Sequence, residues 1–142
     1  MLPDQHLLEL LLKSPSITPC DAGCIKIIAD FLQTPPKDLS IHDTTNAYFE
    51  FGSSGPLLLF VGHTDVVPPG PEQNWHTPPF PENISHNPII ARGIVDMKGA
   101  IWAFCSAFQS IRHNLCGRVG ILLTSDEEGS GKHGISPVVD KL

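Results

Sequence analysis

The chain has 142 residues, of which 41% are hydrophobic and 17% are charged, and its formal net charge at pH 7 is −6. These values are typical of one globular domain with a sizeable core, not of a disordered chain. The acidic balance argues against a nucleic-acid partner, which requires a basic face, and no apolar run is long enough to span a membrane. Because no basic region precedes an apolar core near the N-terminus, we expect a cytoplasmic protein.

The cysteines give no sign of a structural metal site or of a disulfide framework. There are four of them, and none forms a Cys-x-x-Cys pair. Cys20 and Cys24 lie four residues apart in a helical pattern, and Cys105 lies in a second helical pattern. We therefore expect reduced, partly buried thiols.

Two helices are predicted in the first third of the chain. Leucines at helical spacing predict an amphipathic helix over 3–13. A second helix is expected from Thr18, as its N-cap, to about Gln33, with Pro19 in the first turn. The residues expected to face inward from this second helix are Cys24, Ile27, Ile28 and Phe31.

Strands are expected wherever short apolar runs are bounded by turn residues. The first two are short and cover 39–42 and 47–51, and Ile89 to Ala91 is a third candidate. The unbroken run Leu57 to Val61 predicts a buried strand, and a further strand is expected over 119–124.

The remaining segments are a long loop, two helices and a glycine-rich loop. The loop over 66–88 is rich in proline, and we expect Trp75 and Phe80 to anchor it. A helix is predicted from Lys98 to about Arg112, followed after the last strand by a loop over 126–134. Ser136 and Pro137 begin a helix that Leu142 cuts short, which is expected of a fragment. The alternation of helices and strands predicts an α/β sandwich.

Acidic groups and one histidine follow the predicted strands and a glycine turn. His63 and Asp65 come directly after one strand, Glu127 and Glu128 follow the last strand, and Asp96 precedes a helix. Each feature alone has an ordinary explanation, such as a loop histidine, a helix N-cap or a solvated acidic run. Together they provide imidazole and carboxylate, which are the usual ligands of a hydrolytic zinc.

The chain also resembles the succinyl-diaminopimelate desuccinylase family, whose members are di-zinc amidohydrolases of the metallo-exopeptidase superfamily. The resemblance covers nearly the whole chain in the right order. The segments that carry it are Pro15–Pro19, Asp21–Cys24, Gly62–Gly70, Trp75 with Pro78–Phe80, Arg92–Gly93, Asp96–Gly99 and Thr124–Gly129.

The resemblance implies a role for each of five residues. His63 would bind the first of two zinc ions, Asp96 would bridge both ions, and Glu128 would bind the second. Glu127 would act as the general base, and Asp65 would hold His63. Cobalt is a possible substitute for zinc in such a site.

The implied reaction is hydrolysis of N-succinyl-LL-2,6-diaminopimelate to succinate and LL-2,6-diaminopimelate, a step in lysine biosynthesis. The implied fold is a three-layer α/β sandwich with a central mixed sheet, of which residues 1–142 are the N-terminal part of the catalytic domain. The lid domain, through which the complete enzyme forms a homodimer, and the remaining metal ligands would be absent. We therefore expect this chain to bind zinc weakly and not to turn over a substrate.

Two alternatives stay open from the sequence. One is a sister enzyme, such as an acylornithine deacetylase or a related metallo-exopeptidase, because these share the metal-binding motifs and differ in the missing half. The other is a non-catalytic truncated relic or binding module that keeps the fold. For the desuccinylase and for the sister enzyme we expect a small-molecule substrate. We do not expect a nucleic acid or a membrane as a partner under any of the three interpretations.

Overall fold

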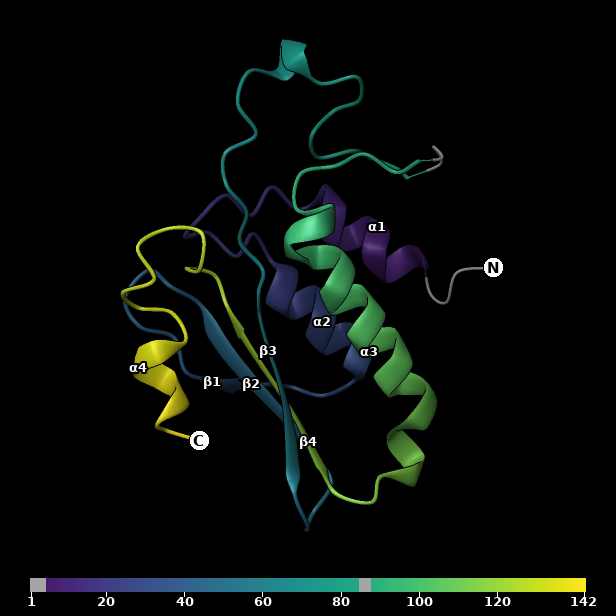
Figure 1. The fold of residues 1–142 in the computed structure, drawn as a ribbon, viewed down its shortest axis with the longest axis vertical. Helices are drawn as coiled ribbons and strands as arrows, with labels where there is room; N and C mark the ends of the chain where they lie inside the picture. Colours follow the sequence, from purple (N-terminus) through teal and green to yellow (C-terminus); the bar gives the residue numbers. More distant parts are fainter. Residues whose placement is uncertain (1–4, 85–87) are drawn as a thin grey trace.

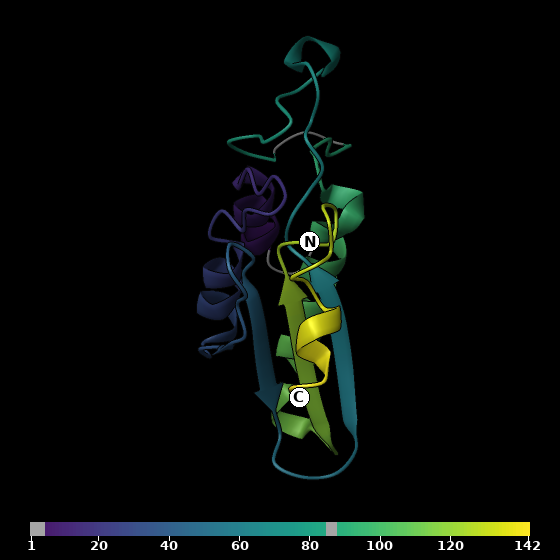
Figure 2. The ribbon, with the colours of Figure 1, turned by 90° about the vertical axis from the view of Figure 1, so that its left-hand side faces the viewer.

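The computed structural model describes residues 5–84 and 88–142, in which helices lie on both faces of one mixed sheet. Three helices cover one face, namely α1 (Gln5–Lys13), α2 (Cys24–Leu32) and α3 (Gly99–Ile111). The short helix α4 (Ser136–Val139) lies on the opposite face (Figures 1 and 2). The predicted three-layer α/β sandwich is confirmed.

The sheet has four strands in the order β1-β2-β4-β3. They are β1 (Lys37–Asp38), β2 (Asn46–Phe51), β3 (Leu57–His63) and β4 (Arg118–Thr124). β2 is antiparallel to both of its neighbours, whereas β3 and β4 run parallel, so the sheet is mixed as predicted. The parallel pairing aligns the last residue of β3 with the last residue of β4. The segments that follow these two strands therefore leave the sheet at the same edge.

Alternate side chains of the central strand β4 supply two separate cores, because successive residues of a strand point to opposite faces. Ile121 and Leu123 pack with the apolar faces of α1, α2 and α3 in the main core. Leu122 points the other way and packs with Tyr48 and with Val138 of α4. Both faces of β4 are covered, so this strand is buried along nearly all of its length.

The second helix begins later than predicted. Thr18 is not its N-cap, because α2 starts only at Cys24, after Gly23 with a left-handed φ of 83°. The carboxylate of Asp21 accepts the backbone N–H of Ile25 and so takes over the capping role. Thr18 instead runs beside the exit of β3, where its N–H donates to the carbonyl oxygen of Val66. Cys24 and Ile28 are buried as predicted, whereas Ile27 and Phe31 are only partly buried.

Two of the predicted strands are wrong in position or absent. The strand expected over 39–42 is replaced by β1 at Lys37–Asp38, and Ile41 forms only an isolated bridge with Thr44. Residues 89–91 do not form a strand. The predictions for β2, β4, α1 and α3 agree with the structure, except that Pro3 and Asp4 of the first predicted helix lie outside the described residues.

The expectation that β3 is a buried strand is wrong for most of its length. Leu58 is 64% exposed and Val61 is 42% exposed, and the strand becomes buried only at Gly62 and His63. The physical reason is its place in the sheet: among the described residues, β3 pairs with β4 on one side only. An apolar run therefore indicated the strand correctly but not its burial.

The long proline-rich loop projects away from the sheet (Figure 1) and contains the short helical turn η1 (Glu72–Asn74). Trp75 is half-buried and contacts both the start of the loop and a residue beyond its end. Its indole N–H donates to the carbonyl oxygen of Pro69 at 3.0 Å, and the guanidinium of Arg92 lies 5.2 Å from the ring centroid. Phe80 is also half-buried, and residues 85–87 of the predicted loop lie outside the described residues.

Three further features complete the fold. A helical turn, η3 (Arg112–Asn114), ends α3 before the chain enters β4. All four cysteines are free, with Cys24 and Cys105 buried and the other two exposed, as expected for reduced thiols. No helix in 5–84 or 88–142 has the length and apolar character that crossing a bilayer requires.

Candidate metal centre

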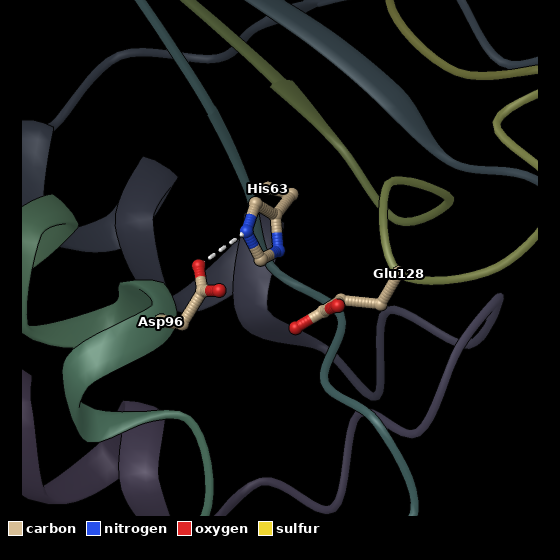
Figure 3. Close-up of side chains that lie close together, drawn as sticks. All are labelled: His63, Asp96 and Glu128. Atoms are coloured by element: carbon tan, nitrogen blue, oxygen red, sulfur yellow. Dashed lines mark hydrogen bonds and ion pairs between the residues drawn. The ribbon is translucent and has the colours of Figure 1, made fainter.

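Three side chains from separate segments converge beyond the aligned ends of β3 and β4 (Figure 3). His63 is the last residue of β3, Asp96 lies in the turn before α3, and Glu128 lies in the loop after β4. One potential ligand atom from each residue lies within 4.8 Å of the other two. The Nε2 atom of His63 lies 3.0 Å from the Oδ1 atom of Asp96. The structure thus brings the three predicted metal ligands together.

His63 is held so that one ring nitrogen faces the centre. Its Nδ1 atom lies 2.9 Å from the carbonyl oxygen of Asp65 and 3.6 Å from that residue's carboxylate, which leaves Nε2 pointing toward Asp96. Burial disfavours the charged imidazole, but the hydrogen bonds with Asp65 and Asp96 outweigh it and raise the pKa of His63 to about 9. Without a metal, the site therefore favours a proton on this ring.

Asp65 is fully buried and holds two segments at once. Besides facing His63, its carboxylate accepts the backbone N–H of Glu127 at 3.2 Å and that of Glu128 at 3.0 Å. Burial acts to raise the pKa of Asp65, but these hydrogen bonds and the one with His63 lower it overall. The sequence predicted a contact with His63 only, and the hold on the Glu127–Glu128 backbone was missed because it joins segments 62 residues apart.

Asp96 lies in an irregular turn, η2 (Ile94–Lys98), that packs against the exit of β3. A Cβ atom on Gly93, whose φ is 81°, would lie 2.4 Å from the side chain of Val66, so only glycine allows this approach. At the other end of the turn, the sulfur of Met97 accepts the backbone N–H of His63 at 3.3 Å. The side chain of Asp96 itself is 70% exposed.

The acidic loop after β4 is organised by Asp126, whose role was not anticipated. Its buried carboxylate accepts hydrogen bonds from the hydroxyl of Ser130 and the N–H of Gly131. Glu127 is exposed, with one carboxylate oxygen 3.9 Å from Nε2 of His63. Burial and the negative charge of Asp96 raise the pKa of Glu128, because both disfavour its charged form.

Sequence reasoning also missed a segment near the N-terminus that hydrogen-bonds to the residues next to His63 and next to the acidic loop. We call the segment Ser14–Asp21 the brace. Within it, the hydroxyl of Ser16 donates to the carbonyl oxygen of Thr64 at 2.7 Å, and Asp21 accepts the hydroxyl of Thr64 at 2.8 Å. The carbonyl oxygen of Pro19 accepts the hydroxyl of Ser125, next to the acidic loop. The only sequence signal for the brace was its likeness to the opening of the desuccinylase family.

A cavity of about 410 Å³ lies beside the centre. Its lining includes Asp96 and Glu128 together with the half-buried Arg92 and the exposed Val95. A ligand in this cavity would therefore touch two of the three converging side chains.

The converging groups fit a divalent cation. One imidazole nitrogen and carboxylate oxygens from two residues are the donor types that zinc binds in hydrolytic enzymes, and they lie close enough to share an ion. Two of these residues are at least partly exposed, so the centre is open to solvent on that side. The elements that carry it, two strand ends and a glycine turn, are those predicted from the sequence, and the parallel pairing of the two strands is what aligns their ends.

Comparison with known proteins gives the family. The model of peptidase family M20/M25/M40 matches residues 59–142. A succinyl-diaminopimelate desuccinylase of Hahella chejuensis is 42% identical over 99% of this chain, and one of Methylococcus capsulatus is 42% identical over 93% of it. The chain spans only 38% and 37% of the length of these two relatives.

Solved structures agree with this assignment. An M20 family metallo-carboxypeptidase of Sulfolobus solfataricus matches 87% of this chain and 30% of its own, with a TM-score of 0.71 and 26% identity. Human carnosine dipeptidase 1 matches 96% of this chain and 34% of its own, with a TM-score of 0.76, and at 22% identity it supports the fold alone. The matched model covers more than half of the chain and includes all three converging side chains, so the chain belongs to peptidase family M20/M25/M40.

Proposed function

We propose that residues 1–142 are the N-terminal part of the catalytic domain of a zinc-dependent amidohydrolase. The complete protein would hydrolyse N-succinyl-LL-2,6-diaminopimelate to succinate and LL-2,6-diaminopimelate. The observation that carries the proposal is the convergence of His63, Asp96 and Glu128 within 4.8 Å. The choice of substrate is supported by the desuccinylase relatives, which are 42% identical over nearly the whole chain.

Each converging residue has a distinct role in this proposal. His63 would hold one cation through Nε2, Glu128 would hold the other, and the two carboxylate oxygens of Asp96 would be available to both. When bound, two zinc ions, or cobalt in their place, lower the pKa of a water molecule and polarise the scissile carbonyl. Asp65 keeps Nδ1 of His63 engaged, so Nε2, which faces Asp96, is the nitrogen that would bind the cation.

Glu127 is the proposed general base. Its carboxylate is exposed and lies 3.9 Å from Nε2 of His63, so it borders the centre without being a member of the converging set. It would take the proton of the attacking water and pass it to the leaving amine. Neighbouring Glu128 is less exposed and points into the shared space (Figure 3), which suits a ligand better than a base.

The proposal also includes assembly and location. Dimerisation through a lid domain of the complete protein and a cytoplasmic location follow from the family resemblance, and the substrate would be a small molecule. Neither a nucleic acid nor a membrane has a part in the proposed reaction.

The metal centre can be tested on the 142-residue chain itself. Zinc uptake is measured by competition with a chromophoric chelator and by elemental analysis. We expect weak uptake that His63→Ala and Asp96→Ala each reduce by at least 100-fold, because either change removes a ligand. Asp140→Ala, which removes an exposed carboxylate directly after α4, is the control. Equal zinc uptake by all four proteins would contradict the proposed centre.

The reaction needs the complete gene product. Release of succinate from N-succinyl-LL-2,6-diaminopimelate is compared with release of acetate from N-acetylornithine, and a preference for the second substrate would favour the sister deacetylase. Glu127→Gln in that protein should keep its metal and lose turnover, whereas Asp96→Ala should lose the metal. A complete protein that binds zinc but hydrolyses neither substrate would favour a non-catalytic module.

A further inference from the structure

Lys98 is a fully buried lysine two residues after Asp96. Its ammonium donates to the carbonyl oxygens of Leu11 and Ser14, each at 2.7 Å. A buried ammonium is costly unless its donors are satisfied, so these two hydrogen bonds are essential to its placement. Both acceptors lie at or just beyond the C-terminal end of α1, where the helix dipole places partial negative charge, and each also accepts a backbone N–H, from Ser14 and Ser16 respectively. The site is thus matched to a positive charge in sign as well as in geometry.

The same residue ends the turn that carries Asp96. Lys98 is the last residue of η2, and its backbone N–H closes the turn by donating to the carbonyl oxygen of Gly93 at 2.8 Å. The Asp96 side chain is 70% exposed, and among the described residues its hydrogen bond is with Nε2 of His63. The direction of that carboxylate is therefore set by the backbone of the turn, which the Lys98 side chain ties to α1.

The end of α1 leads directly into the brace, which holds the other ligand. Two residues beyond Ser14, the hydroxyl of Ser16 donates to the carbonyl oxygen of Thr64, and the backbone of Ser16 accepts the N–H of Val66. Residues 14–16 are thus bonded both to the Asp96 turn, through Lys98, and to the segment directly after His63. The separation of His63 and Asp96 depends on this shared support.

We propose that Lys98 is a positioning residue of the metal centre, which fixes the Asp96 carboxylate relative to His63 by tying the turn to the end of α1. The inference rests on the proposed metal centre and adds to it a buried lysine that touches neither metal nor substrate. A role as a mere filler of the core is the alternative, and it predicts a loss of stability without a selective effect on the metal.

The test uses Lys98→Met, which keeps most of the side-chain volume and removes the donors. Cobalt affinity and the visible absorption spectrum of bound cobalt are measured on the 142-residue chain, at a temperature where circular dichroism shows each variant folded. We expect a 10- to 100-fold loss of affinity, the range typical when a residue that supports a ligand is removed, together with a shifted spectrum. Lys98→Gln, which places a neutral donor there, takes the same test if Lys98→Met does not fold.

Two control variants separate positioning from stability and from charge. Val138→Ala opens a cavity in the core on the far side of the sheet, where Val138 packs under α4. Lys26→Met removes an exposed lysine that pairs with Asp30, and so makes the same change in net charge. Both controls should bind cobalt within twofold of wild type and with an unchanged spectrum.

Each outcome decides the matter. Lys98→Met with wild-type affinity and spectrum overturns the inference, and so does an equal loss of affinity in Lys98→Met and Val138→Ala. Both results leave the proposed metal centre standing, because wild type still binds. A wild-type chain that binds no cobalt or zinc overturns the proposed centre and this inference with it. Selective loss in the Lys98 variant supports the positioning role.

Discussion

The two sides of the proposed metal centre are built differently. On one side, His63 is 5% exposed and Asp65 is fully buried, and hydrogen bonds from several segments hold both residues. On the other side, the Asp96 side chain is 70% exposed and the Glu127 side chain is 57% exposed, with few contacts of their own. The proposed centre thus combines a buried, hydrogen-bonded half with an exposed acidic half.

This difference shows how the side chains of each half are positioned. The buried half is positioned by side-chain hydrogen bonds, so its geometry should be coupled to the stability of the fold. The exposed half is positioned by backbone turns, which leaves its carboxylates accessible to a cation and a substrate. Mutations on the two sides should therefore separate stability from metal binding.

The largest effect is expected from Asp65→Ala. The change removes the acceptor of two buried N–H groups and the partner of His63, and leaving such donors unpaired should cost about 3 kcal/mol of unfolding free energy. Urea unfolding measures this loss, and Asp140→Ala, at an exposed carboxylate, should change the free energy by less than about 0.5 kcal/mol. Equal stabilities for the two variants would mean that the buried half is not coupled to the fold.

The next largest effect is on pH dependence. Because a cation needs the neutral imidazole, and the pKa of His63 is about 9, metal uptake must displace a proton at neutral pH. Apparent cobalt affinity should therefore rise by about tenfold per pH unit, or roughly 100-fold from pH 6 to pH 8. In the metal-free chain the sign is opposite: the raised pKa stabilises the fold below pH 6.5, and that stabilisation is lost as the pH rises through about 9.

Isothermal titration in buffers of different ionisation enthalpy checks both the affinity and the proton release. His113→Gln, which removes an exposed imidazole, should leave the profile unchanged. An affinity that is constant from pH 6 to pH 8 would contradict the link between His63 and the cation.

A smaller effect is expected from Thr64→Val in the buried half. Valine keeps the shape of threonine but removes the hydroxyl that donates to Asp21 at 2.8 Å, which should cost about 1 kcal/mol and reduce metal affinity by less than tenfold. Thr44→Val is the matched control, because the hydroxyl of Thr44 is buried and has no hydrogen-bond partner in the described part of the chain. Thermal unfolding compares the stabilities of the two variants. A larger loss of stability in Thr44→Val than in Thr64→Val would contradict a stabilising role for the hydrogen bond between Thr64 and the brace.

The smallest effect is expected from Glu127→Gln in the exposed half. Since Glu127 is exposed and outside the converging set, the change should leave stability intact and metal affinity within about threefold. Glu128→Gln, at the neighbouring position, should lower metal affinity by at least tenfold because it weakens a ligand. Equal losses at the two positions would contradict the division of roles between them.

Local sequence patterns predicted most of the elements but not the way in which they are held. Leucine spacing indicated α1, and apolar runs indicated β3 and β4. The same reasoning misplaced the start of α2, because the capping group is Asp21 rather than Thr18. It also predicted a buried β3, since an apolar run carries no information about whether a strand lies at the edge of its sheet.

By itself, the sequence determined the chemical types at the site: one histidine and several carboxylates, each placed directly after a strand or before a helix. These features depend on neighbours along the chain, which periodicity and motifs record. Only the tertiary structure decided that Asp65 holds the Glu127–Glu128 backbone and that Lys98 is bonded to the end of α1, 84 and 87 residues away. Such contacts form because packing brings distant backbone groups beside buried charges, and no local pattern reports which distant group will satisfy them.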